Sequence, residues 1–264
     1  MVDRKAQALI IGVEYTNYAR QNSDDRLPGC HNDARTMQGI LRRKYGVSYR
    51  NMTVLMDDGR HGAPTRQNIL RQIHRLINSG KKRLWLTFSG HGTYMSDSGR
   101  DEKDGKDEAL VPADYRTSGM IKDDEIRNYL LRIPKGVQFT AIYDCCHSGT
   151  MSDLPTSFMA SRPARAQKLA IGTFHPKRQS QLISLSACMD AQYSYSVYNL
   201  ANRKKWRGLL TYCFSKLKKR YLPGNILLKF IQKEINRRGI PQLTTLSTNK
   251  AYGHSRQVKF PFVR

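Results

Sequence analysis

Largely apolar runs alternate with amphipathic segments along most of the chain. The run QALIIGVEY at residues 7–15 has the pattern of a buried strand, and residues 32–46 repeat apolar side chains at the spacing of a helix. The two patterns recur in order, with strand-like runs at 52–58, 83–93, 135–150 and 181–187 and helical patterns at 66–80, 204–221 and 225–239. Thr65 is a suitable N-cap for the second helix. This alternation predicts an α/β fold with a largely parallel sheet sandwiched between helices.

Length and cysteine content narrow the class of protein. A chain of 264 residues with 39% hydrophobic content is long enough for one full core, so we expect a single domain over residues 1–264. No apolar run approaches the length of a membrane-spanning helix, and the first residues lack a signal-peptide pattern. Five cysteines, two of them adjacent, do not suggest a disulfide framework. We expect an intracellular, cytoplasmic protein with reduced thiols and no membrane insertion; the nucleus is the alternative location.

The charge of the chain is high and unevenly distributed. Lys and Arg number 45 against 21 Asp and Glu, which gives a formal net charge of +24. Ten of the acidic residues lie within residues 97–125, and only four lie beyond Arg127. So basic a surface attracts nucleic acid, anionic membranes or acidic proteins. Nonspecific nucleic-acid contact through the basic C-terminal half is one expectation, and a solvated basic surface without a specific partner is the alternative.

Two of the strand-like runs end in reactive side chains. FSGHGT places His91 between two glycines, and DCCHSGT contains Cys145 and Cys146. Functional groups collect beyond the carboxyl ends of parallel strands, so this histidine and a cysteine could meet. An imidazole can take the proton of a thiol and later protonate a leaving amine, and main-chain N–H groups around Gly149 could bind an oxyanion. The pair favours an acyl-transfer enzyme; two structural cysteines and a turn histidine are the alternative.

The pair FSGHGT and DCCHSG resembles the signature of the caspase-like cysteine peptidases, and within them the chain resembles a type I metacaspase. Segments that resemble the family in family order are ALIIGVEY, LPGCHNDA, DGKDEALVPAD, IKDDEI, SACMDAQYS, GLLTYCF and PQLTTLS. The resemblance covers nearly the whole chain. It implies a caspase-hemoglobinase fold with a large part at 1–155, a basic linker loop at 156–180 and a small part at 181–264.

The same resemblance assigns roles at the two strand ends. It implies a calcium-stimulated cysteine endopeptidase with Cys146 as the nucleophile and His91 as the base. Cys145 and His147 are expected to point away from the site, because side chains alternate along a strand.

Four residues are assigned by the resemblance to the pocket for the substrate residue before the scissile bond. They are Cys30, Asp33, Ser89 and Asp144. Two carboxylates facing one guanidinium favour Arg, accept Lys and repel Asp, so we expect protein or peptide substrates with Arg or Lys before the scissile bond. Asp33 also fits an ordinary acidic residue at a helix N-terminus.

The acidic cluster supplies a candidate calcium site, because Ca²⁺ prefers several carboxylate oxygens. The resemblance implies as ligands Asp107, Asp123, Asp124 and Asp153. Calcium would then activate the enzyme without taking part in bond breaking. The run DEKDGKDE is not an EF-hand, since Lys103 occupies a ligand position, and Asp104 is an alternative to Asp107. Asp123 and Asp124 also fit the first turn of a helix.

Three features separate the chain from the relatives that it resembles. The sequence shows no Pro/Gln-rich or zinc-finger prodomain, its net charge is extreme, and its linker is basic. The linker offers as self-cleavage positions Arg162, Arg165, Lys168, Lys177 and Arg178. We expect a monomer. The alternative function is a basic nucleic-acid-binding or scaffold protein on the same fold.

Overall fold

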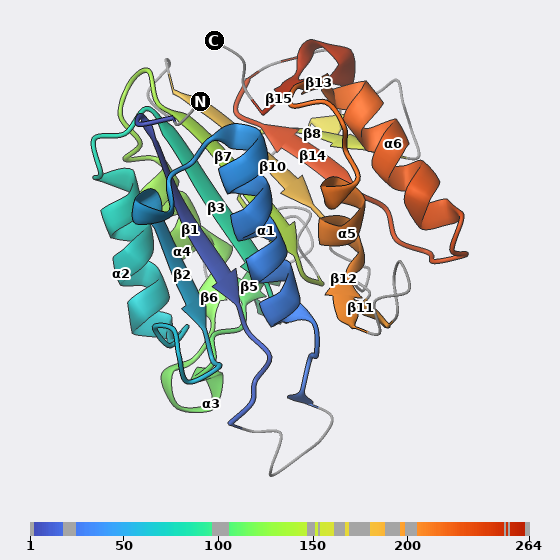
Figure 1. The fold of residues 1–264 in the computed structure, drawn as a ribbon. Coiled ribbons are helices and arrows are strands. Elements are labelled where there is room, and N and C mark those ends of the chain that lie inside the picture. The colour runs from blue at the N-terminus through green and yellow to red at the C-terminus, as the bar shows by residue number, and fades with distance from the viewer. Residues whose placement is uncertain are drawn as a thin grey trace.

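A sheet of eight strands forms the centre of the molecule, in the order β2–β1–β3–β7–β10–β14–β8–β9 (Figure 1). The computed structural model describes residues 3–17, 25–96, 106–146, 151–152, 154–160, 167–168, 180–187, 196–198, 205–250, 252 and 254–261. The strands of the sheet are β1 (Ala6–Gly12), β2 (Met52–Met56), β3 (Arg83–Ser89), β7 (Gln138–Asp144), β8 (Thr156–Met159), β9 (Gln167–Lys168), β10 (Gln181–Ser186) and β14 (Thr245–Thr248). The five strands from β2 to β10 are parallel, and β14, β8 and β9 continue the sheet in antiparallel pairing.

The helices and three small sheets surround this centre. The α-helices are α1 (Cys30–Tyr45), α2 (Arg66–Ile77), α3 (Tyr115–Ser118), α4 (Asp123–Leu130), α5 (Leu209–Ser215) and α6 (Gly224–Asn236), and the short 3₁₀ helices are η2 (Tyr49–Asn51) and η4 (Ser255–Gln257). The small sheets pair β4 (Gly92–Ser96), β5 (Lys106–Leu110) and β6 (Ile121–Lys122); β11 (Ser196–Tyr198) and β12 (Trp206–Gly208); and β13 (Leu222–Pro223) and β15 (Lys259–Phe260). Within the described residues, no helix is long and apolar enough to cross a membrane.

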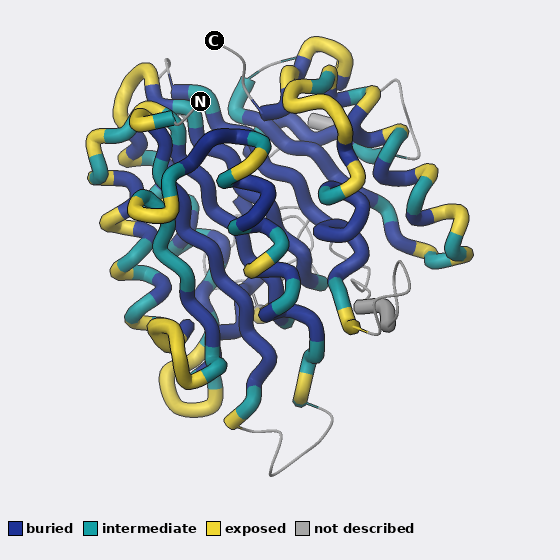
Figure 2. Tube along the Cα trace, viewed as in Figure 1, coloured by how far each residue is buried: buried dark blue, intermediate teal, exposed yellow. Residues whose placement is uncertain are grey.

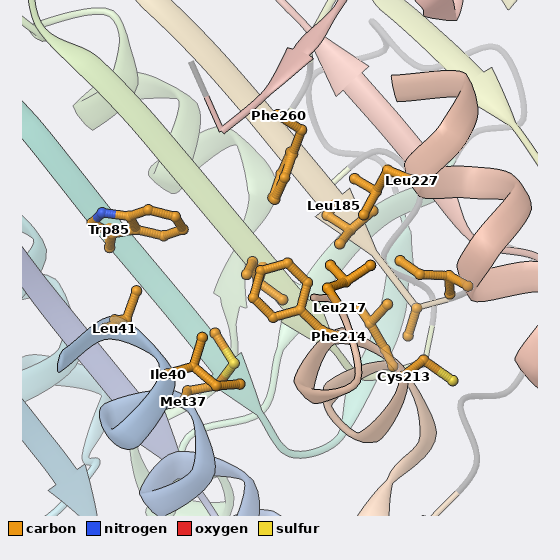
Figure 3. Packing of buried hydrophobic residues seen from close by; sticks show 14 of the residues in the cluster. Met37, Ile40, Leu41, Trp85, Leu185, Cys213, Phe214, Leu217, Leu227 and Phe260 are labelled. Atoms are coloured by element: carbon orange, nitrogen blue, oxygen red, sulfur yellow. The ribbon is translucent and has the colours of Figure 1, made fainter. Parts of the chain in front are cut away.

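Alternate residues of the sheet face two separate hydrophobic clusters, as the side-chain period of a strand requires. In β1, Ala8 and Ile10 belong to the cluster with α1, α5 and α6, whereas Leu9 and Ile11 belong to the cluster with α2 and α4. Figure 3 shows the first cluster between the sheet and its helices, and Figure 2 shows that the central strands are buried along most of their length. The sheet sandwiched between helices that the sequence predicts is confirmed.

Helix α2 begins as predicted, because the side chain of Thr65 accepts a hydrogen bond from the N–H of Asn68 at 3.3 Å. The helix predicted at 204–221 is wrong in its extent. Its first residues form strand β12, and helix α5 covers only Leu209–Ser215. Six consecutive residues of α5, from Leu209 to Phe214, are buried, so this helix is enclosed on all sides.

Three antiparallel strands of the central sheet were not anticipated from the sequence. Strand β14 lies between β10 and β8, and β8 and β9 lie inside the range 156–180 that was predicted to be a basic linker loop. The buried Phe158 of β8 belongs to the cluster beneath α5 and α6, which explains why residues 156–159 pair in the sheet and do not form a surface loop.

Candidate active site

The two reactive strand ends lie side by side. Strands β3 and β7 are parallel neighbours whose last paired residues are Ser89 and Asp144. His91 and Cys146 each follow these partners by two positions, so the histidine and the cysteine leave the same edge of the sheet at the same level. The structure therefore brings both residues of the proposed dyad to one site.

His91 is held by Tyr15 and by a loop carbonyl. The N–H of His91 donates to the Tyr15 hydroxyl at 2.7 Å, and the two rings lie with centroids 4.8 Å apart. Its Nε2 is 3.2 Å from the carbonyl oxygen of Asp25, which can only accept a hydrogen bond. This contact requires a proton on Nε2 and leaves Nδ1 of the neutral ring as the base. Burial lowers the pKa of His91, although the Asp25 carbonyl opposes that shift, so the neutral form is favoured near pH 7.

The two adjacent cysteines differ in accessibility. Cys145 is 1% exposed and packs in the cluster with α2 and α4, whereas Cys146 is half-buried. Only Cys146 is therefore open to a substrate in this structure. His147 and Gly149, which the sequence analysis placed around this turn, lie outside the described residues.

Gly92 fits tightly against the backbone of Cys146. A Cβ at Gly92 would lie 1.9 Å from the carbonyl oxygen of Cys146 and 3.3 Å from Sγ of Cys145. The contact is with a backbone atom, which cannot move aside as the end of a flexible side chain can. The glycine after His91 thus lets β4 pass close beside the cysteine.

We expect Gly92→Ala to lower kcat/KM by about a hundredfold, because a shift of roughly 1 Å between reacting groups has this effect. Peptide hydrolysis and thermal unfolding, measured on the same preparation, check the result. Gly39→Ala is the matched control, since a Cβ there meets only the mobile guanidinium of Arg43. A Gly92→Ala enzyme with wild-type kcat/KM would show that the close approach has no role.

Two buried carboxylates lie beneath these strand ends. Asp33, in the first turn of α1, is 1% exposed, and Asp144, the last residue of β7, is 5% exposed. Asp33 Oδ2 accepts hydrogen bonds from Ser89 Oγ at 3.0 Å and from the N–H of Gly208 at 2.8 Å. Asp144 Oδ2 accepts one from the N–H of Thr211 at 2.7 Å. A Cβ at Gly208 would lie 2.3 Å from Asp144 Oδ2 and 2.8 Å from Asp33 Oδ2, so both carboxylates flank this glycine.

The electrostatics of this acidic pair favour a cation. Burial raises the pKa of Asp33 well above its usual range, and the nearby Asp144 raises it further. Asp33 Oδ1 is buried and has no hydrogen-bond partner among the described residues. Burial also raises the pKa of the Cys30 thiol, with Asp33 adding to the shift, so Cys30 stays neutral. The four residues of the sequence-predicted pocket therefore gather around one incompletely satisfied carboxylate.

The proposed calcium ligands are only partly described. Asp123 is 2% exposed at the start of α4, and its carboxylate accepts hydrogen bonds from the N–H groups of Glu108 and Asp124 at 3.2 and 2.8 Å. Asp124 forms an ion pair with Arg127 at 3.4 Å. Asp107 has its backbone in β5, next to Glu108, but its side chain is outside the described part, as is all of Asp153. Among the described side chains, no group of three or more His, Cys, Asp or Glu residues could hold a metal.

Several residues of the site were missed from the sequence. Glu14 Oε1 accepts hydrogen bonds from the N–H groups of Gly29 and His31 at 2.9 and 3.1 Å, and Asp57 lies 2.7 Å from Nε2 of His31. The Glu14 contacts join the segment after β1, which carries Tyr15, to the start of α1, which carries Asp33, and the Asp57 contact joins the end of β2 to the same helix. Tyr15 itself has φ 57°, an unusual value for a non-glycine residue. The contacts span 15 to 26 residues of sequence, and no local pattern signals them.

A histidine and a half-buried cysteine thus follow two adjacent parallel strands, as expected of a caspase-like cysteine peptidase. A family model described as the metacaspase, peptidase C14 domain matches residues 6–155. The chain belongs to the metacaspase family.

Curated relatives agree with this assignment. The chain is 32% identical over 268 residues to metacaspase-2 of Trypanosoma brucei brucei, across 94% of this chain and 74% of that protein. It is 42% identical to metacaspase-1 of Cryptococcus neoformans and 40% identical to metacaspase III c of Phaeodactylum tricornutum, and it spans 33% and 46% of their lengths. These matches cover 57% and 58% of this chain. A solved structure of a Geobacter sulfurreducens protein shares the fold, with a TM-score of 0.59, 23% identity and 94% of each chain covered.

Proposed function

We propose that the protein is a cysteine endopeptidase that cleaves after Arg or Lys, with Cys146 as the nucleophile and His91 as the base. The buried pair Asp33 and Asp144 carries this proposal, because Asp33 keeps one oxygen without a hydrogen bond. A guanidinium or ammonium in this pocket would offset the repulsion between the two carboxylates and donate to that oxygen.

We propose the following chemistry for these groups. Nδ1 of His91 takes the proton of the Cys146 thiol, and the thiolate attacks the carbonyl carbon of the substrate. The sequence-predicted oxyanion donors are backbone N–H groups around Gly149, outside the described residues, and His91 would then give the proton to the departing amine. Water, deprotonated by the same imidazole, cleaves the thioester and releases the acid product. An open cavity of about 290 Å³ beside His91, lined by Tyr15 and Tyr115, offers space for the substrate chain.

We propose calcium as an activator, held by Asp107, Asp123, Asp124 and Asp153. The donor set fits the ion, since carboxylate oxygens are its preferred ligands. Residues of β5 lie next to the start of α4, because Ala109 pairs with Lys122 and the Glu108 N–H donates to Asp123. Bound calcium would neutralise this acidic cluster and order the neighbouring loops.

Self-cleavage in the basic linker is part of the same proposal. Of the five basic candidates, Lys168 lies in β9, where it pairs with Thr156. A residue paired in a sheet must first detach before it can enter a cleft. We therefore place the cut at one of the other four, Arg162, Arg165, Lys177 or Arg178. We also propose an intracellular monomer, with nonspecific nucleic-acid contact as a secondary property of its positive charge.

Matched fluorogenic peptides that end in Arg, Lys or Asp test the proposal. The wild-type protein should hydrolyse the Arg and Lys peptides, lose activity with a calcium chelator and regain it when calcium is added back. The Asp peptide should remain intact, because the two carboxylates repel it. Cleavage after Asp would overturn the assignment of the acidic pocket. Full activity in chelator would overturn the calcium site alone.

A further inference from the structure

A second pocket, which neither His91 nor Cys146 lines, lies where α1, the segment that contains β12 and the end of α5 meet. It has a volume of about 460 Å³. This volume is within the roughly 300–1,000 Å³ of small-molecule sites. Helices α1 and α5 lie next to each other in Figure 1, with β12 at the lower end of α5.

Five cationic side chains from these three elements converge on the pocket. They are Arg35, Arg43, Lys205, Arg207 and Lys216. Among its described lining residues there is no carboxylate. Within the described part of the chain, only Arg35 of the five forms an ion pair, at 3.1 Å to Asp58. Arg207 has a buried Nε that makes no hydrogen bond in the described structure, so a donor at the pocket wall is left unused.

The pattern differs from that of an ordinary solvated basic face. Clefts lined by charges of one sign focus the field and raise the local concentration of ions of the opposite sign. Here the five cationic side chains surround one hollow, together with the uncharged polar side chains of Asn32, Thr36 and Ser215. Guanidinium groups match phosphate oxygens with two parallel hydrogen bonds, and lysines add point charges. Arg35 is paired with Asp58, and the charge of Arg207 also acts on Asp33. A single carboxylate would still leave Arg43, Lys205 and Lys216 largely uncompensated, whereas a ligand with several phosphate groups would not.

We propose that this pocket binds a small molecule with several phosphate groups. The site shares strand β12 with the acidic pair, because Arg207 lines the pocket and the N–H of its neighbour Gly208 donates to Asp33. The Asn32 side chain also donates to the Trp206 carbonyl at 3.1 Å, which ties β12 to α1 at the pocket rim. A polyphosphate that bridges these elements stabilises the folded arrangement of α1, β12 and α5.

Calorimetric titration of the full chain with inorganic tripolyphosphate tests this site. The buffer holds neither phosphate nor calcium, because tripolyphosphate binds calcium itself. We expect saturable binding to one site, a rise in melting temperature, and loss of affinity as salt is added. Parallel titrations with ATP and with inositol hexakisphosphate identify which phosphate source the pocket prefers.

The double variant Arg43→Ala/Lys216→Ala removes two of the five cations. We expect tripolyphosphate affinity to fall at least about tenfold, because the loss of even one hydrogen bond to a charged group lowers affinity by about that factor. The matched control is Arg75→Ala/Lys135→Ala, which removes the same charges from exposed positions in α2 and after α4, on the opposite face of the sheet. It should bind as the wild type does.

Three results would overturn the proposal. The first is no binding of any of the three phosphate compounds by a folded protein. The second is an equal loss of affinity in both double variants, which would indicate attraction by net charge alone. The third is pocket-dependent binding of a single-stranded oligonucleotide but of none of the small phosphates, which would make the hollow part of a nucleic-acid groove.

Discussion

Cys146→Ala is expected to remove peptide hydrolysis almost completely, by at least about a thousandfold in kcat. The change deletes the atom that we propose to form the thioester, while His91 and the acidic pair remain. Cys146 is half-buried at a strand end, so little packing is lost and the variant should unfold near the wild-type temperature. The measurement is hydrolysis of an Arg peptide, together with mass spectrometry after brief alkylation. The label should be on Cys146 in the wild type and absent from this variant.

Cys145→Ala is the matched control, because it removes the neighbouring thiol. Cys145 is 1% exposed and contacts the apolar cluster, so we expect a loss of stability on the order of 1 kcal/mol and retained catalysis. Activity that disappears in Cys145→Ala and persists in Cys146→Ala would assign the nucleophile to the other cysteine. Undiminished activity in both variants would overturn Cys146 as the required nucleophile.

Asp33→Asn is expected to stabilise the protein and to impair catalysis at the same time. The asparagine oxygen can still accept from Ser89 and Gly208, but the buried charge next to Asp144 is gone. For Arg peptides, kcat/KM should fall at least about a hundredfold, because a charged partner of the guanidinium is lost. The stability gain at neutral pH should be on the order of 1 kcal/mol.

The pH dependence of the Asp33→Asn effect has a definite sign. Because the pKa of Asp33 is raised by folding, its stabilising contribution is complete below the unfolded pKa of about 3.9 and is lost as pH rises through the folded pKa. The melting temperature of the variant should therefore exceed that of the wild type increasingly from acid to neutral pH.

Asp58→Asn is the control, because its effect on stability at neutral pH should have the opposite sign. Burial acts to raise the pKa of Asp58, but hydrogen bonds from Arg60 and His61 outweigh it and lower the value to about 2. Its contribution is present above the unfolded pKa, so Asp58→Asn should destabilise the protein at neutral pH. A destabilised Asp33→Asn protein at neutral pH would mean that Asp33 is a structural acid and not a strained pocket residue.

The strand ends and the dyad could be predicted from the sequence because their signals are local. The apolar pattern of each buried strand and the reactive residue at its end, in FSGHG or DCCHSG, lie within about a dozen residues of each other in the sequence. That β3 and β7 are neighbours in the sheet is a finding of the structure, because a parallel arrangement does not by itself fix the strand order.

Helix α5 and strand β12 could not be predicted in the same way. A helix buried on all sides has no amphipathic period, and the lysines that follow it imitate a polar face. The hydrogen bonds from Gly208 and Thr211 to the carboxylates join residues 175 and 67 positions apart, so their role depends on tertiary packing. The link from Glu14 and Asp57 to His31 is hidden for the same reason.

The order of strands in the central sheet determines whether the two pieces of a cleaved chain stay together. Strands β10 and β14 come late in the sequence, yet they lie between β7 and β8, which come early. A cut between β8 and β10 therefore leaves β7 and β8 in one piece and β10 and β14 in the other. The two pieces remain paired through the backbone hydrogen bonds of β7 with β10 and of β14 with β8. Such a clipped molecule would migrate as two fragments after denaturation and as one particle in native solution.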